Sequence, residues 1–352
     1  MNNTAIQTIN NSELNTRWQE FKERNPKTRI RDAAIALGVS EAELLATNGG
    51  ETVTRLDVDF GKFLTELDAL GRVMALTRND EIVHERKGRY SRVELFPEHN
   101  NMGQVLDEGI DLRLFLSHWH LAFAVQEESP HGTRRSFQFF DARGTAVHKV
   151  FLLDDSNIEA FDEFISRYKT QDQPQTLTVT PKPEPTKEKP DDEIDVEGFR
   201  DGWSKMTDTH EFFQLTRKFG VSREQALRLA SNEMARKVSR ESYKKVLEES
   251  AKNESRIMVF VGNAGVIQIH SGRVKNIKTV GNWFNVLDPD FNLHINEDRI
   301  ANAYVVRKPT SDGFVTSLEL FNERGDNIAL FFSKRKPGEV ENDNWRELLA
   351  SC

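Results

Sequence analysis

The segment of this chain best suited to chemistry is Met206–Gly220, where a single histidine stands among three phenylalanines. Asp208 and Glu211 have the spacing of a capping box, and Gly220 suits the position after a helix end, so the segment predicts a helix of about three turns. His210 would lie in its first turn, where the positive end of the helix dipole disfavours imidazolium. Neutral imidazole is the form that ligates metals.

One imidazole beside aromatic rings suits a large, flat, apolar cofactor better than a hydrated ion. Haem held by one proximal histidine fits that description. The alternative is a hydrogen-bonded structural or surface histidine, because Phe212, Leu215 and Phe219 recur at the spacing of any helix core, with Phe213 beside them. An internal repeat bears on this choice: at a shift of 182 residues, the position equivalent to His210 in the first half is Thr28, so the repeated fold does not need a histidine there.

The two halves of the chain resemble one another. At a shift of 181 residues, the segment 106–144 falls onto 287–325, and ten of the 39 positions are identical. Such a repeat predicts two copies of one domain in tandem. We expect the first copy at residues 1–169, a linker at 170–195 and the second copy, with His210, at 196–352. The linker is rich in charge and proline (Pro174, Pro181, Pro183, Pro185 and Pro190), which favours an extended chain.

Each copy begins with helices and continues with strands joined by short polar links, which suits hairpins and an antiparallel meander. The expected fold is α+β, with N-terminal helices packed on an antiparallel sheet, and the two copies would form a pseudo-dimer. Capping boxes are expected at Ser40/Glu43 and Ser222/Gln225. Helices are expected at 13–25, 30–37, 158–168 and 344–350. Strands are expected at 72–76, 112–115, 121–126, 136–140, 148–153, 257–261, 266–270, 292–295, 303–307, 316–321 and 327–332.

Composition narrows the class of protein. The net charge of −8, from 48 basic and 56 acidic residues, disfavours a general nucleic-acid binder. Cys352 is the only cysteine, so no disulfide framework or thiolate metal site is expected. The N-terminus does not read as a signal peptide, and no apolar run approaches the roughly 20 residues that span a bilayer. We therefore expect a cytoplasmic protein without membrane insertion.

Five segments in register resemble the bacterial haemin-degrading and haemin-transport proteins of the HemS/ChuS/HmuS family. The similarity runs from about residue 14 to 350. Those segments are Thr207–Phe213, Asp111–Leu116, Ser136–Asp141, Phe260–Asn263 and Arg307–Phe321.

The resemblance implies a role for several residues. It makes His210 the proximal ligand of the haem iron and Arg113 the residue on the opposite face, with the haem between the two halves. It makes Arg223, Lys308 and Arg335 the cations that hold the propionates, and Phe213 and Phe260 part of the pocket. The family's tyrosine near the last strand is Phe332 here. A weaker second haem site is implied at His84.

The residues themselves leave alternatives open. Arg223, Lys308 and Arg335 each also fit a solvated surface charge. Arg113 lies in an apolar strand pattern, where a guanidinium needs a partner or a site, and an interdomain salt bridge would satisfy it. His84 also fits a surface histidine at a strand end and turn. His118 and His120 have no third ligand nearby in the sequence, so we interpret them as structural or exposed.

Two functions follow from such a pocket. The first is an enzyme that opens the haem ring oxidatively and releases iron, in which Arg113 would direct the chemistry at the iron. The sequence shows no NAD or flavin fingerprint, so a partner reductase or a small reductant would supply electrons. The second is a carrier that receives haem from an inner-membrane importer and passes it on intact. Both need the same pocket.

Overall fold

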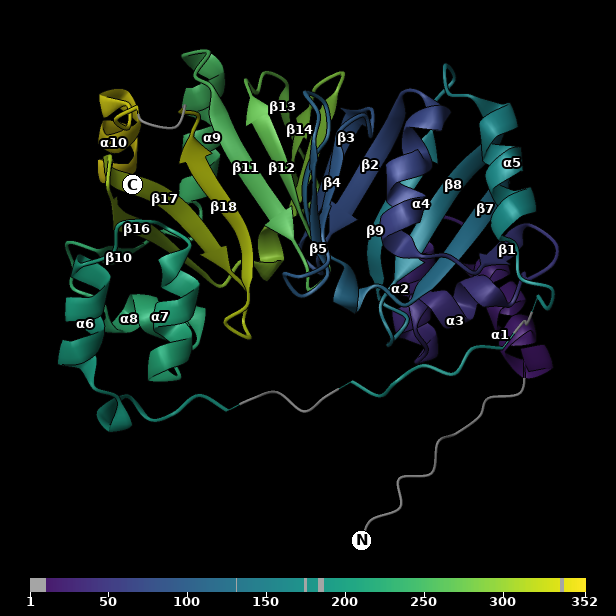
Figure 1. Cartoon of the computed structure of the whole chain (residues 1–352), viewed down its shortest axis with the longest axis horizontal. Helices are drawn as coiled ribbons and strands as arrows, with labels where there is room; N and C mark the ends of the chain where they lie inside the picture. Colours follow the sequence, from purple (N-terminus) through teal and green to yellow (C-terminus); the bar gives the residue numbers. More distant parts are fainter. Residues whose placement is uncertain (1–10, 131, 174–175, 183–186, 336–338) are drawn as a thin grey trace, which may run out of the picture. The chain divides into compact units, whose positions relative to one another are not determined.

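The computed structural model describes residues 11–130, 132–173, 176–182, 187–335 and 339–352. Pro174, Pro183 and Pro185 of the expected linker, and residues 1–10, therefore lie outside the described residues. The chain divides into two compact units (Figure 1). Unit 1 comprises Met1–Leu76, Lys87–Pro183 and Ala264–Val266, and unit 2 comprises Thr77–Arg86, Glu184–Asn263 and Ile267–Cys352. Each unit thus contains a short segment from the other half of the sequence.

Unit 1 combines helices with antiparallel strands. Its helices are α1 (Asn11–Arg24), α2 (Ile30–Leu37), α3 (Glu41–Ala46), α4 (Phe60–Glu66) and α5 (Ile158–Tyr168). Its strands run in the order β1 (Val53–Leu56), β7 (Leu121–Ser129), β8 (Gly132–Phe140), β9 (Ala146–Leu152) and β2 (Val73–Arg78). A second group pairs β4 (Val93–Phe96), β5 (Met102–Leu106) and β6 (Asp111–Phe115). Packing of α4 and α5 on one face of these strands buries a core rich in phenylalanine.

Unit 2 repeats this plan. Its helices are α6 (Val196–Ser204), α7 (Glu211–Phe219), α8 (Arg223–Leu229), α9 (Ser242–Lys252) and α10 (Asp343–Ala350). Its larger sheet has the order β10 (Ala235–Val238), β16 (Asn302–Thr310), β17 (Gly313–Phe321), β18 (Asn327–Ser333), β11 (Ile257–Gly262) and β12 (Val266–Gly272). A second group pairs β13 (Ile277–Val280), β14 (Trp283–Leu287), β15 (Phe291–Asn296) and β3 (Ile82–Gly88).

The helices of unit 2 form two groups on different parts of the larger sheet. Helices α6, α7 and α8 gather beside β10 and β16, as Figure 1 shows, and bury Phe199, Trp203 and Phe212 against Tyr304 and Val306. Helices α9 and α10 instead pack with the core that contains β11, β14 and β15. The first group matters for function, because it carries His210 and Arg223.

The α+β class and the repeated domain are confirmed, and so are the expected helices and strands. The helices expected at 30–37 and 158–168 match the observed ones, and the other expected elements differ from the observed ones by at most four residues at their ends. Helices α4, α6 and α9 and strands β1, β3, β4, β5, β10, β13 and β14 were not expected. Many of these are short strands whose pairing depends on distant partners. Among the described residues, no helix is long and apolar enough to cross a membrane.

The two expected capping boxes have different outcomes. Ser40 and Glu43 form the full reciprocal pair: Glu43 N donates to Ser40 Oγ, and Ser40 N donates to the Glu43 carboxylate. At Ser222, only half forms, because Gln225 N donates to Ser222 Oγ while the Gln225 side chain turns elsewhere. A glutamine amide can donate as well as accept, and here it donates to groups in the linker.

Candidate functional site

His210 lies at the N-terminus of α7 with its imidazole open to solvent; its side chain is 94% exposed. Asp208 contacts it twice, since the Asp208 Oδ1 accepts from His210 N at 2.7 Å and lies 2.6 Å from His210 Nδ1. These two hydrogen bonds lower the pKa of Asp208. A carboxylate at Nδ1 favours the tautomer with its proton there, which leaves the Nε2 lone pair for a ligand.

The expected capping box at this helix is wrong. The helix begins at Glu211, and His210 itself is the N-cap residue, without a side-chain capping bond. Asp208 bonds to His210 instead of the helix, and the Glu211 carboxylate accepts from Thr207 Oγ1 at 2.8 Å. The expected helix end is confirmed, because Gly220 has φ 66°, a left-handed conformation that suits glycine.

The loop before His210 is tied to the sheet. Ser311 N, in the turn between β16 and β17, donates to Thr207 O at 2.8 Å. Below it, the Trp203 ring packs edge-on against Phe212, with ring centres 4.6 Å apart, and its Nε1 donates to Arg307 O. The predicted apolar stripe of α7 is therefore core, whereas Phe213 points away from it and is 66% exposed. The His210 loop thus has a fixed base while its imidazole stays accessible.

Two of the expected propionate cations lie together beside α7. Lys308 Nζ donates to Glu319 Oε1 at 2.8 Å, and the Arg223 guanidinium donates to both oxygens of the same carboxylate at 2.8 and 2.9 Å. Lys308 and Glu319 are buried, so a solvated surface charge is the wrong interpretation for Lys308. Burial disfavours the charged form of Glu319, but the two cations outweigh it and lower its pKa well below the ordinary value.

Phe212 joins these cations to the histidine loop. Its ring lies 4.6 Å from Lys308 Nζ and 5.3 Å from the Arg223 guanidinium carbon, within the range of cation–π attraction. Since Phe212 and His210 are two residues apart at the start of α7, the structure brings His210, Arg223 and Lys308 into one neighbourhood. Glu319 is a member of this site that the sequence did not single out, and Phe212, which the sequence placed in the helix core, is another member.

Phe260 is placed by β-sheet register on the same face as Glu319. Strand pairing sets Glu319 opposite Leu330, and Leu330 opposite Phe260, so the three form one cross-strand row. Phe260 is half-buried, and its ring lies 5.1 Å edge-on from that of Phe332. This face therefore carries aromatic surface two strands from the ionic cluster.

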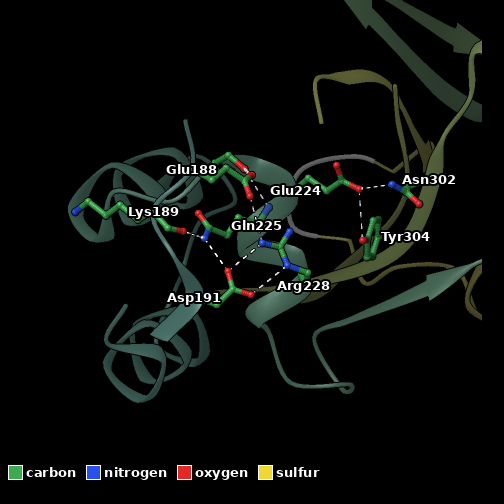
Figure 2. Close-up of polar contacts among 9 residues, drawn as sticks. Glu188, Lys189, Asp191, Glu224, Gln225, Arg228, Asn302 and Tyr304 are labelled. Atoms are coloured by element: carbon green, nitrogen blue, oxygen red, sulfur yellow. Dashed lines mark hydrogen bonds and ion pairs between the residues drawn. The ribbon is translucent and has the colours of Figure 1, made fainter. Parts of the chain in front are cut away.

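Helix α8, which begins at Arg223, is anchored by the end of the linker (Figure 2). The Gln225 side chain donates to Lys189 O at 2.7 Å and to Asp191 Oδ1 at 2.8 Å, and Arg228 also bonds to Asp191. On the sheet side, Glu224 accepts from Asn302 at 2.7 Å. These contacts explain why the Gln225 half of the capping box is missing, and they hold Arg223 in place.

Arg335 follows β18 and is not part of the ionic cluster; its Nη1 donates to Glu339 O at 3.0 Å. Its neighbours 336–338 lie outside the described residues. Its role stays a prediction.

Arg113 lies in β6, in unit 1. Leu112 and Leu114 are buried, and Arg113 alternates with them onto the other face of the strand, with a side chain 36% exposed. Its Nη1 donates to Asp111 Oδ1 at 2.5 Å. The ion pair that the structure shows is thus local to one strand, and the role of Arg113 opposite the iron stays a prediction.

His84 departs from the surface interpretation. It is fully buried in the middle of β3, opposite Leu293 of β15, and neither ring nitrogen has a hydrogen-bond partner among the described residues. Its burial lowers the pKa of His84 well below the ordinary value. In this structure the His84 ring is closed off from solvent. His118 and His120, in contrast, are exposed as expected.

The site of unit 2 therefore combines one accessible imidazole, a carboxylate that orients it, a pair of cations and aromatic surface. A single imidazole is the donor that a metal with its own equatorial ligands requires, and the cations suit acidic groups on the same molecule. The residues fit a haem with its propionates.

Comparison with known proteins gives a consistent result. The model of the Haemin-degrading HemS.ChuX domain matches residues 38–168 and 220–352. The hemin transport protein HmuS of Yersinia pestis is 36% identical over 341 residues, which are 97% of each chain. The crystal structure of holo-PhuS, a heme-binding protein from Pseudomonas aeruginosa, superposes with a TM-score of 0.94 at 45% identity, over 97% of this chain and 99% of that one. ChuS, an E. coli heme oxygenase, superposes with a TM-score of 0.85 at 35% identity, over 96% and 98%.

Proposed function

This chain belongs to the family of the Haemin-degrading HemS.ChuX domain, and we propose that it binds haem through His210 and degrades it, with opening of the ring and release of iron. The observation that carries the proposal is the exposed imidazole of His210 with Asp208 at its Nδ1. A carboxylate there makes Nε2 a better donor for iron and holds the ring in one orientation.

Haem is the substrate as well as the bound group in this proposal. When bound, it supplies the iron at which oxygen is activated. The chain itself contributes orientation: His210 ligates the iron, Arg223 and Lys308 receive the acidic edge, and Phe213 and Phe260 offer apolar surface. Arg335 and Arg113 are proposed as a further propionate cation and as the residue on the open face of the iron. Electrons would come from a reductase or a small reductant.

The similar proteins support both halves of the proposal. PhuS is described as heme-binding and ChuS as a heme oxygenase. HmuS is described as a hemin transport protein, and this supports a second candidate, a carrier that takes haem from an importer and passes it on intact. A weak second haem site at His84, and a cytoplasmic location, are further expectations of the same kind.

One experiment separates the two functions. Purified protein is loaded with haemin, ascorbate is added in the presence of catalase, and the spectrum is followed from the Soret band to the near infrared. Catalase removes free peroxide, which bleaches haem without an enzyme. Loss of the Soret band with a new long-wavelength chromophore and chelatable iron supports degradation. A stable reduced-haem spectrum, with transfer of intact haem to an apo-acceptor, would favour the carrier.

A further inference from the structure

The ionic cluster of Arg223, Lys308 and Glu319 carries more positive than negative charge. Two cations contact one carboxylate, and their side chains differ in exposure: 33% for Arg223, 5% for Lys308 and none for Glu319. One positive charge is therefore left over, and its most accessible carrier is the guanidinium. A surplus charge at a partly buried site is costly unless an anion can approach it.

Donors of the cluster are also left over. Arg223 uses Nε and Nη2 on Glu319, so its Nη1 has no acceptor among the described residues. Lys308 uses one of its three donors on Glu319 and turns toward the Phe212 ring. Ser317 Oγ donates to Glu319 Oε1 at 3.1 Å, which further fixes that carboxylate. The cluster has the charge and the donors for one additional carboxylate.

We propose that Glu319 is a positioning residue that keeps Arg223 and Lys308 charged and in place for a single propionate of haem, without contacting haem itself. The inference rests on the proposed function, because it assumes that haem binds at His210. It adds the number of propionates that the cluster binds: because Glu319 neutralises one of the two cations, the remaining positive charge can pair with one propionate.

The role of Glu319 can be measured through the pKa of Lys308. Burial lowers the pKa of Lys308 to about 8; the Glu319 charge opposes this shift and the Arg223 charge adds to it. If Glu319 lost its charge, Lys308 would face Arg223 without an anion and would release its proton at lower pH. A bound carboxylate would restore the proton. Haem affinity should therefore depend on pH around 8, and the removal of Glu319 should move that dependence to lower pH.

The other ionisable group expected on this face of the sheet does not obscure the effect. Tyr304 lies four residues before Lys308 on β16, and therefore on the same face of the strand. Its hydroxyl donates to Glu224, and burial raises the pKa of Tyr304 above its ordinary value. Helix α8 contributes two charged groups: Arg223, which bonds to Glu319, and Glu224, which bonds to Asn302 and Tyr304. From β17 the charged group is Glu319, with Ser317 beside it.

The test compares the wild type with Glu319→Gln, titrating each with haemin and with haemin dimethyl ester, which lacks the acidic groups, from pH 6 to 9. At pH 6 we expect Glu319→Gln to bind haemin as tightly as the wild type or more tightly, because both cations are charged and no anion offsets them. At pH 8 we expect roughly tenfold weaker binding, because Lys308 is neutral. The ester should show no such reversal.

A second readout needs no haem. In the apo-protein, the titration midpoint of the Lys308 ammonium, followed by ¹⁵N NMR, should fall in Glu319→Gln. The matched control is Glu81→Gln, which removes another buried carboxylate of unit 2, one bonded to Asn322 rather than to these cations. It should leave both the midpoint and the pH dependence unchanged.

Each outcome of these titrations supports or overturns the proposed role of Glu319. Equal losses for haemin and the ester at every pH, or no change, would overturn the role of Glu319. If the wild type binds neither compound at His210, the proposed function itself fails. That result differs from a failure of the Glu319 inference, in which the wild type still binds haemin. If Glu319→Gln does not fold, Lys308→Arg serves instead, since arginine does not titrate in this range. That variant should bind haemin without the pH dependence, and persistence of the dependence would refute the inference.

Discussion

Asp208 Oδ1 lies 2.6 Å from Nδ1 of His210 and also accepts from the backbone N of the same residue. One carboxylate thus fixes both the backbone and the ring of the proposed iron ligand. Because the imidazole is otherwise open to solvent, this contact is what orients Nε2 before any ligand arrives.

Asp208→Asn should weaken haemin binding by roughly 10–100-fold, the usual effect of mutating the hydrogen-bond partner of a metal-bound histidine. The amide carries no charge to make the ring more basic, so the reduction potential of bound haem should rise as well. Haemin titration and spectroelectrochemistry measure the two effects. Asp201→Asn, which removes an exposed carboxylate bonded to Lys205, is the control and should change neither.

His210→Ala should abolish the sharp Soret spectrum of ligated haem, because the proposed iron ligand is the exposed imidazole of His210. The control is His120→Ala, which removes an exposed histidine outside the site. Thr28→Ala changes the equivalent position of the first repeat and should also leave the spectrum alone. An unchanged Soret band in His210→Ala would refute the assignment of the ligand.

Arg113→Ala should still bind haemin but alter the rate or products of its degradation, since its proposed role is at the open face of the iron and not in ligation. Single-turnover spectra with ascorbate and catalase measure this. Because Asp111 holds the guanidinium at 2.5 Å, Asp111→Asn should give a smaller change in the same direction. Normal turnover in Arg113→Ala would remove the residue from the mechanism.

Unit 1 should lose stability in mild acid through His148. This residue is buried, its Nε2 lies 2.6 Å from the hydroxyl of buried Tyr90, and burial lowers the pKa of His148 to about 3. Below the unfolded value of about 6.5, the unfolded chain takes up a proton that folded His148 refuses. The free energy of unfolding should therefore fall by about 1.4 kcal/mol per pH unit from this residue as pH drops from 6.5 toward 3.

Urea unfolding between pH 7 and 5 checks that slope. His148→Gln cannot take up the proton and should reduce the slope by about one proton, whatever its effect on stability at pH 7. His99→Gln, at an exposed position, should leave the slope unchanged. Equal slopes in the wild type and in His148→Gln would contradict the assignment.

The sequence by itself determined the features that depend on local pattern. The ends of α2 and α5 and the left-handed Gly220 follow from spacing, capping residues and glycine chemistry, which act within a few residues. The repeat identified the α+β domain, and its disagreement at His210 and Thr28 indicated where to look for a ligand. The partner of His210 at Asp208 was misassigned to a helix cap, because a short polar residue before a helix serves either purpose.

Only the tertiary structure decided which charges meet. Arg223 and Glu319 are 96 positions apart, and the pairing of β16 with β17 and the packing of α7 and α8 bring them together with Lys308. In the same way, pairing of β3 with β15 buries His84, which its own neighbours place at a surface turn. Local sequence carries no information about such pairings, because the free energy that selects them comes from burial and strand register between distant segments.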